Sequence, residues 1–341
     1  MDDKNFWYIA CESKDLDSKQ PKAVVILDEW LVLFRDENGM ARALQDRCIH
    51  RSSQLSRGTV VKGCLKCPYH GWTYNCKGDV VDIPAEQGEP VRGRKKAVDY
   101  PVIETQGYIY VNLNRMEAHH TKPFAIPYYG TKGYAHIRLV NRFKNNVTNC
   151  VENFVDIPHT VFVHPTIFRT TKQKKQRMAA QLRREGGSVI VEYKMETDNF
   201  GAFSWFLNPA GSEIIHRDSF HMPNVTHVEY IFGPKRHFNI TSQSIPIGPA
   251  DTLVYTDLTY NYGLWNKMAK PIIRWQAQVI IDQDVEVLNN QWRTIEKYGS
   301  QFMNSNIDII HLMIESIRSE LERKKDPRAL ESKNCEVEFW I

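Results

Sequence analysis

Two short cysteine–histidine pairs constrain this chain more than any other feature of its sequence. Cys48-Ile49-His50 is followed, after sixteen intervening residues, by Cys67-Pro68-Tyr69-His70. Two thiolates and two imidazoles can hold a [2Fe-2S] cluster in which the cysteines bind one iron and the histidines bind the other. Neutral imidazoles raise the reduction potential above that of an all-cysteine cluster, so we expect this centre to accept and pass on single electrons.

A structural zinc site is the alternative for these residues. Cys64-Leu65-Lys66-Cys67 is a C-x2-C pair, and with the other cysteine and the two histidines it offers five ligands of the kind that zinc accepts. The surroundings favour the iron–sulfur cluster, because each cysteine–histidine pair occupies a short loop and the second continues as Gly71-Trp72-Thr73-Tyr74.

The two loops resemble those of the Rieske oxygenases. Cys48-Ile49-His50-Arg51 and Cys67-Pro68-Tyr69-His70-Gly71-Trp72 match the two cluster loops of that family residue for residue. The resemblance implies that Cys48, His50, Cys67 and His70 are the ligands of one Rieske cluster. It also implies that Cys64 is a spare thiol.

The first third of the chain has the pattern of an all-β domain. A length of 341 residues predicts two domains. Short runs rich in β-branched and aromatic residues are separated by the turn-forming segments 36–39 and 75–79. These runs are Phe6–Ala10, Ala23–Leu27, Glu29–Arg35, Val80–Ile83 and Gly107–Asn112. We expect a Rieske domain over residues 1–116, with the cluster loops at the tips of a small β-sandwich.

The remainder, residues 117–341, is expected to be an α+β catalytic domain. A polar stretch with prolines and glycines, from Asn114 to about Lys132, marks the boundary. We expect strands at 136–140, 188–193, 227–232, 240–245 and 253–260, and helices at about 146–155, 270–293 and 307–323. This order predicts an antiparallel sheet wrapped around a long C-terminal helix, with a ligand cavity between them.

A second constellation, Asp156-x2-His159-x4-His164, lies near the start of this domain. Two histidines and one carboxylate on one face of a metal are the ligand set of non-haem Fe(II) enzymes that activate oxygen. On a straight α-helix, side chains five residues apart point about 140° apart, so an unbroken helix could not direct both histidines to one ion. Pro158 and Pro165 are expected to supply the break.

The carboxylate ligand is expected from the long C-terminal helix, where Asp282 and Asp284 compete. Rieske oxygenases have an acid–Asp or Gln–Asp pair in this helix, followed by an alternating apolar run, and Gln283-Asp284-Val285-Glu286-Val287 resembles that pattern. The resemblance favours Asp284 as the third iron ligand. A solvated helix face is the alternative for either acid.

The resemblance also implies a trimer. In the family, the cluster of one subunit lies close to the mononuclear iron of the next, and a carboxylate joins the two. Asp156 corresponds to this carboxylate and would accept hydrogen bonds from His159 and from His70 of a neighbouring copy. Asn153 lies where several members have an asparagine near the iron, and Glu152 either supports the site or is a surface acid.

The implied activity is that of an oxygenase component with one Rieske cluster and one mononuclear Fe(II) per chain. The sequence has no second cysteine quartet and no Gly-rich dinucleotide loop. We therefore expect a separate NAD(P)H-dependent flavin reductase, with or without a ferredoxin, to supply electrons for O2 chemistry. The chain resembles homotrimeric monooxygenases and demethylases more than two-subunit dioxygenases. The alternative is a Rieske electron carrier with a non-catalytic ligand-binding or docking domain.

We expect a small, apolar or aromatic substrate. Phe200–Leu207 could line an apolar pocket or pack in the core. The net charge of +4 is too small to indicate nucleic acid, and the basic runs 92–96 and 172–177 lack interleaved aromatic residues. No apolar stretch approaches the length of a membrane span, and no leader follows Met1. Seven scattered cysteines fit a reducing compartment, so we expect a cytoplasmic protein without a disulfide framework.

Overall fold

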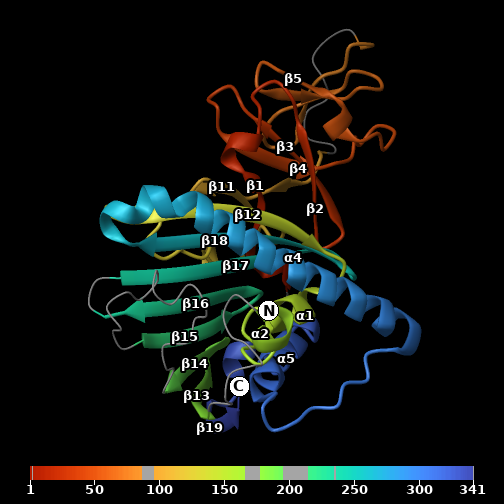
Figure 1. The fold of residues 1–341 in the computed structure, drawn as a ribbon. Coiled ribbons are helices and arrows are strands. Elements are labelled where there is room, and N and C mark those ends of the chain that lie inside the picture. The colour runs from red at the N-terminus through yellow and green to blue at the C-terminus, as the bar shows by residue number, and fades with distance from the viewer. Residues whose placement is uncertain (2, 87–95, 166–176, 195–213, 234–235, 341) are drawn as a thin grey trace. The chain divides into compact units, whose positions relative to one another are not determined.

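A computed structural model describes the chain except residues 2, 87–95, 166–176, 195–213, 234–235 and 341 (Figure 1). It forms two compact units. One comprises Lys4–Ala125, and the other comprises Ile126–Ile341 together with Met1–Asp3. The two units divide after Ala125. A boundary between functional domains after Met116 stays a prediction.

The first unit consists of three antiparallel sheets. One has the order β1-β11-β10, with β1 at Trp7–Glu12, β11 at Tyr108–Asn112 and β10 at Val102–Thr105. The second has the order β2-β3-β4-β9, formed by Lys22–Ile26, Glu29–Arg35, Ala41–Gln45 and Asp99–Tyr100. The third has the order β5-β6-β7-β8, formed by Thr59–Val61, Cys64–Lys66, Thr73–Tyr74 and Val80–Asp82. The predicted all-β class of this region is confirmed.

The predicted turn chemistry of this unit is also confirmed. The turn between β7 and β8 is closed by a hydrogen bond from the Asn75 amide to the Asp79 carbonyl at 3.0 Å. Gly78 there has φ +78°, and a Cβ atom at this position would lie 2.1 Å from the Ala97 carbonyl oxygen. Glycine is therefore required both by the backbone conformation and by the close approach of another segment.

The second unit is built on one eight-stranded antiparallel sheet of order β12-β18-β17-β16-β15-β14-β13-β19. In that order the strands are Ala135–Phe143, Asp251–Asn261, Arg236–Gly248, Val225–Phe232, Ile214–His221, Ser188–Lys194, Arg177–Glu185 and Lys333–Trp340. Three of them, β13, β15 and β19, were not predicted. In β13 the reason is composition: Arg-Met-Ala-Ala-Gln-Leu-Arg-Arg-Glu contains mostly good helix formers, and pairing with strands on both sides overrides that propensity.

Helices cover one face of this sheet (Figure 1). They are α1 (Val147–Asn153), α2 (Thr160–Val163), α4 (Asn266–Tyr298) and α5 (Ile309–Glu322). Short 3-10 turns occur at Asp3–Asn5, Ser13–Asp15, Leu55–Arg57, Ala118–His120, Gly263–Trp265 and Pro327–Ala329. No helix in the described part of the chain is both long and apolar enough to cross a membrane.

Two apolar clusters hold the helices on the sheet. Residues of α4, including Ile273, Ile281 and Leu288, pack with Phe143 of β12 and Leu258 of β18. A second cluster packs α5 and Val147 and Val151 of α1 against β13 and β14. An antiparallel sheet with a long C-terminal helix lying along it is the predicted α+β architecture, which is therefore confirmed.

Candidate metal centres and cavity

The first cysteine–histidine pair lies in the loop after β4, and the second lies in the loop between β6 and β7. Both loops are held by backbone hydrogen bonds, from the Cys48 amide to the Ser53 carbonyl at 2.8 Å and from the Cys67 amide to the Trp72 carbonyl at 2.9 Å. Gly71 supplies the tight return of the second loop with φ +72°. The two loops are thus shaped by their own backbones.

The side chains of these loops form two pairs. Cys48 and Cys67 are buried, at 2% and 3% exposure, and their thiols lie within hydrogen-bonding reach of each other. His50 and His70 have ring centroids 4.6 Å apart, and the buried Nδ1 of His50 has no hydrogen-bond partner in the described part of the chain. One pair of thiols and one pair of imidazoles, carried by the same two loops, fit a Rieske cluster, in which each iron takes one pair.

The surroundings of the Cys67 thiol disfavour its negatively charged thiolate form, so a bound metal would have to stabilise that charge. Burial, and then the hydrogen bond with Cys48, raise the pKa of the Cys67 thiol. Burial also raises the pKa of Tyr74, so this phenol stays protonated; its oxygen lies 3.1 Å from the Cys48 sulfur, to which it can donate a hydrogen bond. Bound iron would favour the thiolates that burial alone disfavours.

The helical segment that carries His159 and His164 is interrupted, as the sequence predicted. Helix α1 ends at Asn153, and the short helix α2 begins after His159 and ends before His164. The backbone leaves helical geometry at His164, which has φ −117° and ψ 53°. The two histidines therefore lie on either side of a single helical turn instead of along one straight helix.

A polar network fixes α1 relative to α4, the helix that carries Asp284. The side chain of Asn146 caps α1 by accepting a hydrogen bond from the Asn149 amide at 2.8 Å. The fully buried Asn145 donates to the Leu288 carbonyl and to the Gln291 side chain, both at 2.8 Å. Because these residues join the two helices, they also set the separation of the histidines from the carboxylate.

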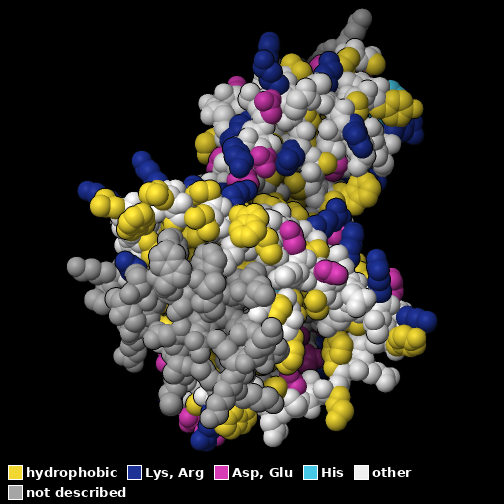
Figure 2. Space-filling view, viewed as in Figure 1, with side chains coloured by type: hydrophobic (Ala, Val, Ile, Leu, Met, Phe, Trp, Pro, Cys, Tyr) yellow, Lys and Arg dark blue, Asp and Glu magenta, His cyan; other side chains and the backbone are white. Residues whose placement is uncertain are grey.

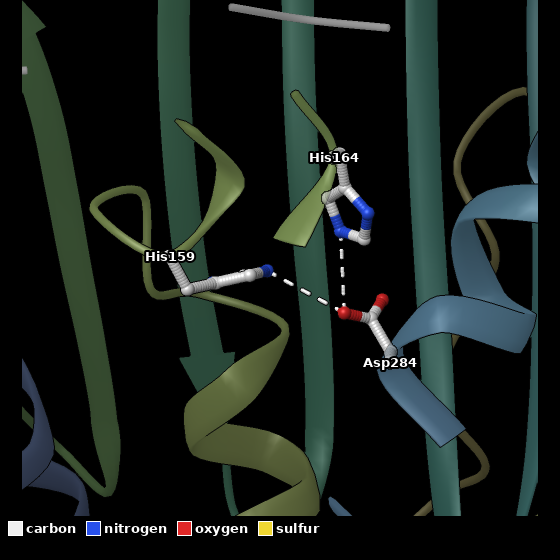
Figure 3. Close-up of side chains that lie close together, drawn as sticks. All are labelled: His159, His164 and Asp284. Carbon is white, nitrogen blue, oxygen red and sulfur yellow. Dashed lines mark ion pairs between the residues drawn. The ribbon is translucent and has the colours of Figure 1, made fainter. Parts of the chain in front are cut away.

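His159, His164 and Asp284 converge (Figure 3). Oδ1 of Asp284 lies 3.5 Å from Nε2 of His159 and 3.2 Å from Nε2 of His164. One possible ligand atom from each of the three lies within 4.8 Å of the others. Asp282 lies elsewhere: it is exposed and accepts a hydrogen bond from Gln278 at 2.8 Å. The geometry therefore favours Asp284 over Asp282.

The outer nitrogens of both histidines have their own partners. Nδ1 of His159 lies 3.2 Å from Oδ2 of Asp156, and Nδ1 of His164 lies 2.8 Å from Oε1 of Gln283. Both partners are acceptors, so each Nδ1 can carry the hydrogen and each Nε2 can present its lone pair to a metal ion bound beside Asp284. The contact of Gln283 with His164 was not predicted, although Gln283 stands beside Asp284 in the helix motif.

The electrostatics of this triad fit a cation. Burial acts to raise the pKa of Asp284, but the nearby imidazoles of His159 and His164 lower it overall. Burial acts to lower the pKa of His159, but Asp156 and Asp284 raise it to about 9. Oδ1 of Asp284 is buried and has no hydrogen bond within the described residues. A divalent metal could replace the proton between these groups, and two histidines with one carboxylate suit Fe(II).

The other predicted residues on α1 differ in where they face. Asn153 lines the cavity described below, and its buried Nδ2 lacks a hydrogen bond to any described residue. Glu152 instead faces α5, with its carboxylate 3.7 Å from Nδ1 of His311. Burial, and then the charges of Glu315 and Asp156, raise the pKa of Glu152 to about 8.

A cavity of about 170 Å³ adjoins the triad. Its walls come from α1, α2, α4 and the inner face of strands β15 to β18. The lining is mostly aliphatic and aromatic, with the three triad side chains at one wall. The predicted cavity between sheet and helix is therefore present. Phe200–Leu207, which was considered as a pocket wall, lies outside the described residues.

Comparison with known families agrees with both units. Residues 6–101 match the Rieske [2Fe-2S] domain, and residues 143–323 match the vanillate O-demethylase oxygenase C-terminal domain. The chain belongs to the Rieske oxygenases. This family has a Rieske cluster and a mononuclear iron, which are the two cofactors that the donor sets fit, and the match disfavours the zinc alternative for the first site.

Individual Rieske oxygenases resemble this chain along different parts of their length. The oxygenase component of dicamba O-demethylase from Stenotrophomonas maltophilia is 27% identical over 324 residues, covering 87% of this chain and 91% of that protein. A putative toluene-4-sulfonate monooxygenase system iron-sulfur subunit from Comamonas testosteroni is 31% identical over 214 residues, covering 60% and 56%. The chain spans about half the length of several such curated relatives.

The same fold occurs in a solved Rieske oxygenase. Dicamba monooxygenase bound to 3,6-dichlorosalicylic acid superposes with a TM-score of 0.81 at 22% identity, covering 94% of this chain and 98% of that chain. At this identity the likeness establishes the fold, and residue roles in this chain depend on its own geometry.

Gln283 offers a test of the outer contacts in this Rieske oxygenase. Gln283→Leu is expected to weaken mononuclear iron binding by about ten-fold or more, because His164 Nδ1 loses the acceptor that fixes the tautomer of the ring. Gln283→Glu keeps an acceptor at the same place and should retain the iron. The measurement is iron retained per chain during titration with a chelator. Equal retention by the leucine variant and the unmodified protein would contradict the assignment.

Proposed function

We propose that this chain is the terminal oxygenase component of a multicomponent Rieske oxygenase system. It would use O2 and electrons from a separate NAD(P)H-dependent reductase, with or without a ferredoxin, to hydroxylate or oxidatively demethylate a small organic molecule. The observation that supports this most directly is the convergence of His159, His164 and Asp284 on the wall of an apolar cavity. A chain that only carried electrons would not require this arrangement.

The proposed division of labour follows the geometry. Cys48, Cys67, His50 and His70 would hold the cluster, and His159, His164 and Asp284 would hold the mononuclear iron. When bound, the cluster supplies single electrons and the iron activates O2. The chain orients the two iron-binding imidazoles through Asp156 and Gln283. The apolar lining excludes water and positions the substrate next to the triad.

We also propose a homotrimer in which Asp156 joins neighbouring copies. Its carboxylate uses one oxygen for His159 and keeps 25% of its side chain exposed. His70 is exposed as well. Both groups are therefore accessible for a contact between subunits, in which His70 of one copy would donate a hydrogen bond to Asp156 of the next.

A surface feature of α4 supports assembly. Met268, Ile272 and Trp275 of α4 are exposed, with Trp275 at 66%. Leu264 and Trp265, in the 3-10 turn just before α4, are exposed as well, with Trp265 at 58%. Their spacing places most of them on one face of the helix, and Figure 2 shows hydrophobic side chains gathered there. An exposed apolar patch of this kind indicates a protein contact.

The proposed function can be tested by a substrate screen with a reconstituted reductase. Substrate-dependent O2 uptake, with a product that has gained one oxygen or lost a methyl group by mass spectrometry, would support an oxygenase. The electron-carrier alternative predicts no such uptake and an iron content that His159→Ala does not change. A panel in which only highly charged compounds stimulate O2 uptake would contradict an apolar or aromatic substrate.

A cytoplasmic location stays a prediction from cysteine content.

Basic residues near the cluster loops are proposed to attract an acidic electron donor. The set comprises Arg42, Arg47, Arg51, Arg57, Lys62 and Lys66. Arg51→Glu is expected to slow cluster reduction by an acidic ferredoxin by about ten-fold at low salt, and by less at high salt, because screening removes the attraction. Stopped-flow bleaching of the cluster measures this rate. Arg177→Glu in the other unit is the control, and an Arg51 effect independent of salt would refute the proposal.

A further inference from the structure

Side chains of four neighbouring strands form the floor of the cavity, and the register of the strands arranges them in a grid of three rows. Asp218, Val228, Ile240 and Leu258 stand opposite one another across β15, β16, β17 and β18, which gives an aliphatic row that ends in a carboxylate. The row on one side of it contains hydroxyl groups, from Thr226, Ser242 and Thr256. The row on the other side contains His216, Tyr230 and Phe238. All ten side chains line the cavity.

His216 and Asp218 form a buried pair at the β15 end of this grid. They are two residues apart on a strand, so both point to the same face. Nε2 of His216 lies 2.9 Å from Oδ1 of Asp218, and the two residues are 1% and 2% exposed. The imidazole is stacked between Tyr193 and Tyr230, at centroid distances of 4.6 Å and 4.2 Å. These contacts fix the ring, and the ring fixes the carboxylate.

The charged groups around the cavity are unevenly distributed. Its described lining contains Asp156, Asp218 and Asp284 but no lysine and no arginine. Asp156 contacts His159, and Asp284 lies between His159 and His164. Asp218 uses one oxygen for His216, and within the described residues its other oxygen has no hydrogen-bond donor. The second oxygen of Asp218 is thus a carboxylate acceptor that the cavity can offer to a ligand, besides the two aspartates that contact the iron-binding histidines.

We propose that Asp218, held in place by His216, recognises the substrate, which is a compact molecule with an apolar body and one N–H or O–H donor. A protonated amine or guanidinium is the best fit, because it adds charge to the hydrogen bond and can lie against the rings of Tyr230 and Phe238. A carboxylate would meet Asp218, and no lysine or arginine among the described lining residues could bind it. The cavity suits a ring-sized body, since a cavity of about 150 Å³ holds benzene. This inference rests on the proposed function, because the triad beside the cavity defines it as the substrate site.

Direct binding to the iron-loaded protein tests the inference without turnover. The probes are benzylammonium, benzyl alcohol, toluene and benzoate, which share one ring and differ in the polar group, and the measurement is calorimetric titration. Benzylammonium is expected to bind about ten-fold or more tightly than benzoate, as for a hydrogen bond to a charged group. Asp218→Asn should lower benzylammonium affinity by about the same factor and leave toluene affinity unchanged.

A matched control lies on the opposite face of the same sheet. Glu192 on β14 pairs with Arg217 on β15 at 2.7 Å and is exposed to solvent, so Glu192→Gln should leave all four affinities unchanged. Benzoate binding as tightly as benzylammonium, or an unaltered preference in a folded Asp218→Asn variant, would overturn the inference. If that variant fails to fold, by circular dichroism, the probe series on the unmodified protein decides alone.

Failure of the proposed function would look different. It would appear as absence of substrate-dependent O2 uptake with every compound screened, whatever the ranking of the four binding affinities. Substrate-dependent uptake together with preferential binding of benzoate would instead refute the role of Asp218 and leave the oxygenase proposal intact.

Discussion

Replacing Asp284 by asparagine is expected to remove one iron per chain and abolish substrate-dependent O2 uptake, while the visible spectrum of the Rieske cluster stays unchanged. Oδ1 of Asp284 lies 3.5 Å from Nε2 of His159 and 3.2 Å from Nε2 of His164, and the amide that replaces the carboxylate supplies no negative charge to a cation. Iron per chain is measured by elemental analysis, and the cluster by absorption and electron paramagnetic resonance after reduction.

Asp282→Asn is the matched control on the same helix. Asp282 is exposed, and its contact is with Gln278. This variant should keep the full iron content and turnover. Loss of iron in the Asp282 variant, with iron retained in the Asp284 variant, would reverse the ligand assignment. Full iron content in both variants would refute a metal site between α2 and α4.

Asp156→Asn is expected to leave both metal centres filled and yet slow turnover by about a hundred-fold. The amide oxygen can still accept a hydrogen bond from Nδ1 of His159, so the iron should remain. The carboxylate charge is lost, however, and the amide nitrogen cannot accept a hydrogen bond from His70 of a neighbouring copy. The measurement is the rate at which the pre-reduced cluster is reoxidised in a single turnover with substrate and O2.

Glu152→Gln tests whether any acid on this segment has the same effect. The pKa of Glu152 is about 8, so at pH 7 the side chain is largely protonated, and a neutral amide of the same shape should change the reoxidation rate little. Near-normal reoxidation in the Asp156 variant would refute the bridge between subunits. Slowing that follows loss of iron would show instead that Asp156 acts only by holding His159.

Strands were predicted correctly where the segment's own residues favour a strand, and were missed where pairing with distant segments decides the structure. Strands β3 and β11 each contain a run of consecutive aromatic and aliphatic residues, and both were predicted within one residue of their ends. Strand β13 lacks that signal, because its composition favours a helix and its pairing partners are β14 and the distant β19. Non-local pairing of this kind leaves little trace in the segment itself.

The residues of the metal triad, too, could not be assigned from local sequence alone. Asp282 and Asp284 are about 200° apart around a helix, so they face opposite ways, and a local motif does not say which face of α4 meets the sheet. The polar network of Asn145, with Leu288 and Gln291 on α4, sets that orientation. Gln283 acquires its contact with His164 for the same reason.

The sequence by itself determined which kinds of ligand are present and that the helix between the two histidines must break, because these depend on residue type and on close spacing along the chain. Only the tertiary structure decided which aspartate meets the histidines, and that His216 and Asp218 lie on the floor of the same cavity. The reason is physical. The position of a residue within a helix or strand sets the direction of its side chain relative to its neighbours in that element. The residues that this side chain meets are set by packing between segments that can lie more than a hundred residues apart, as for His164 and Gln283.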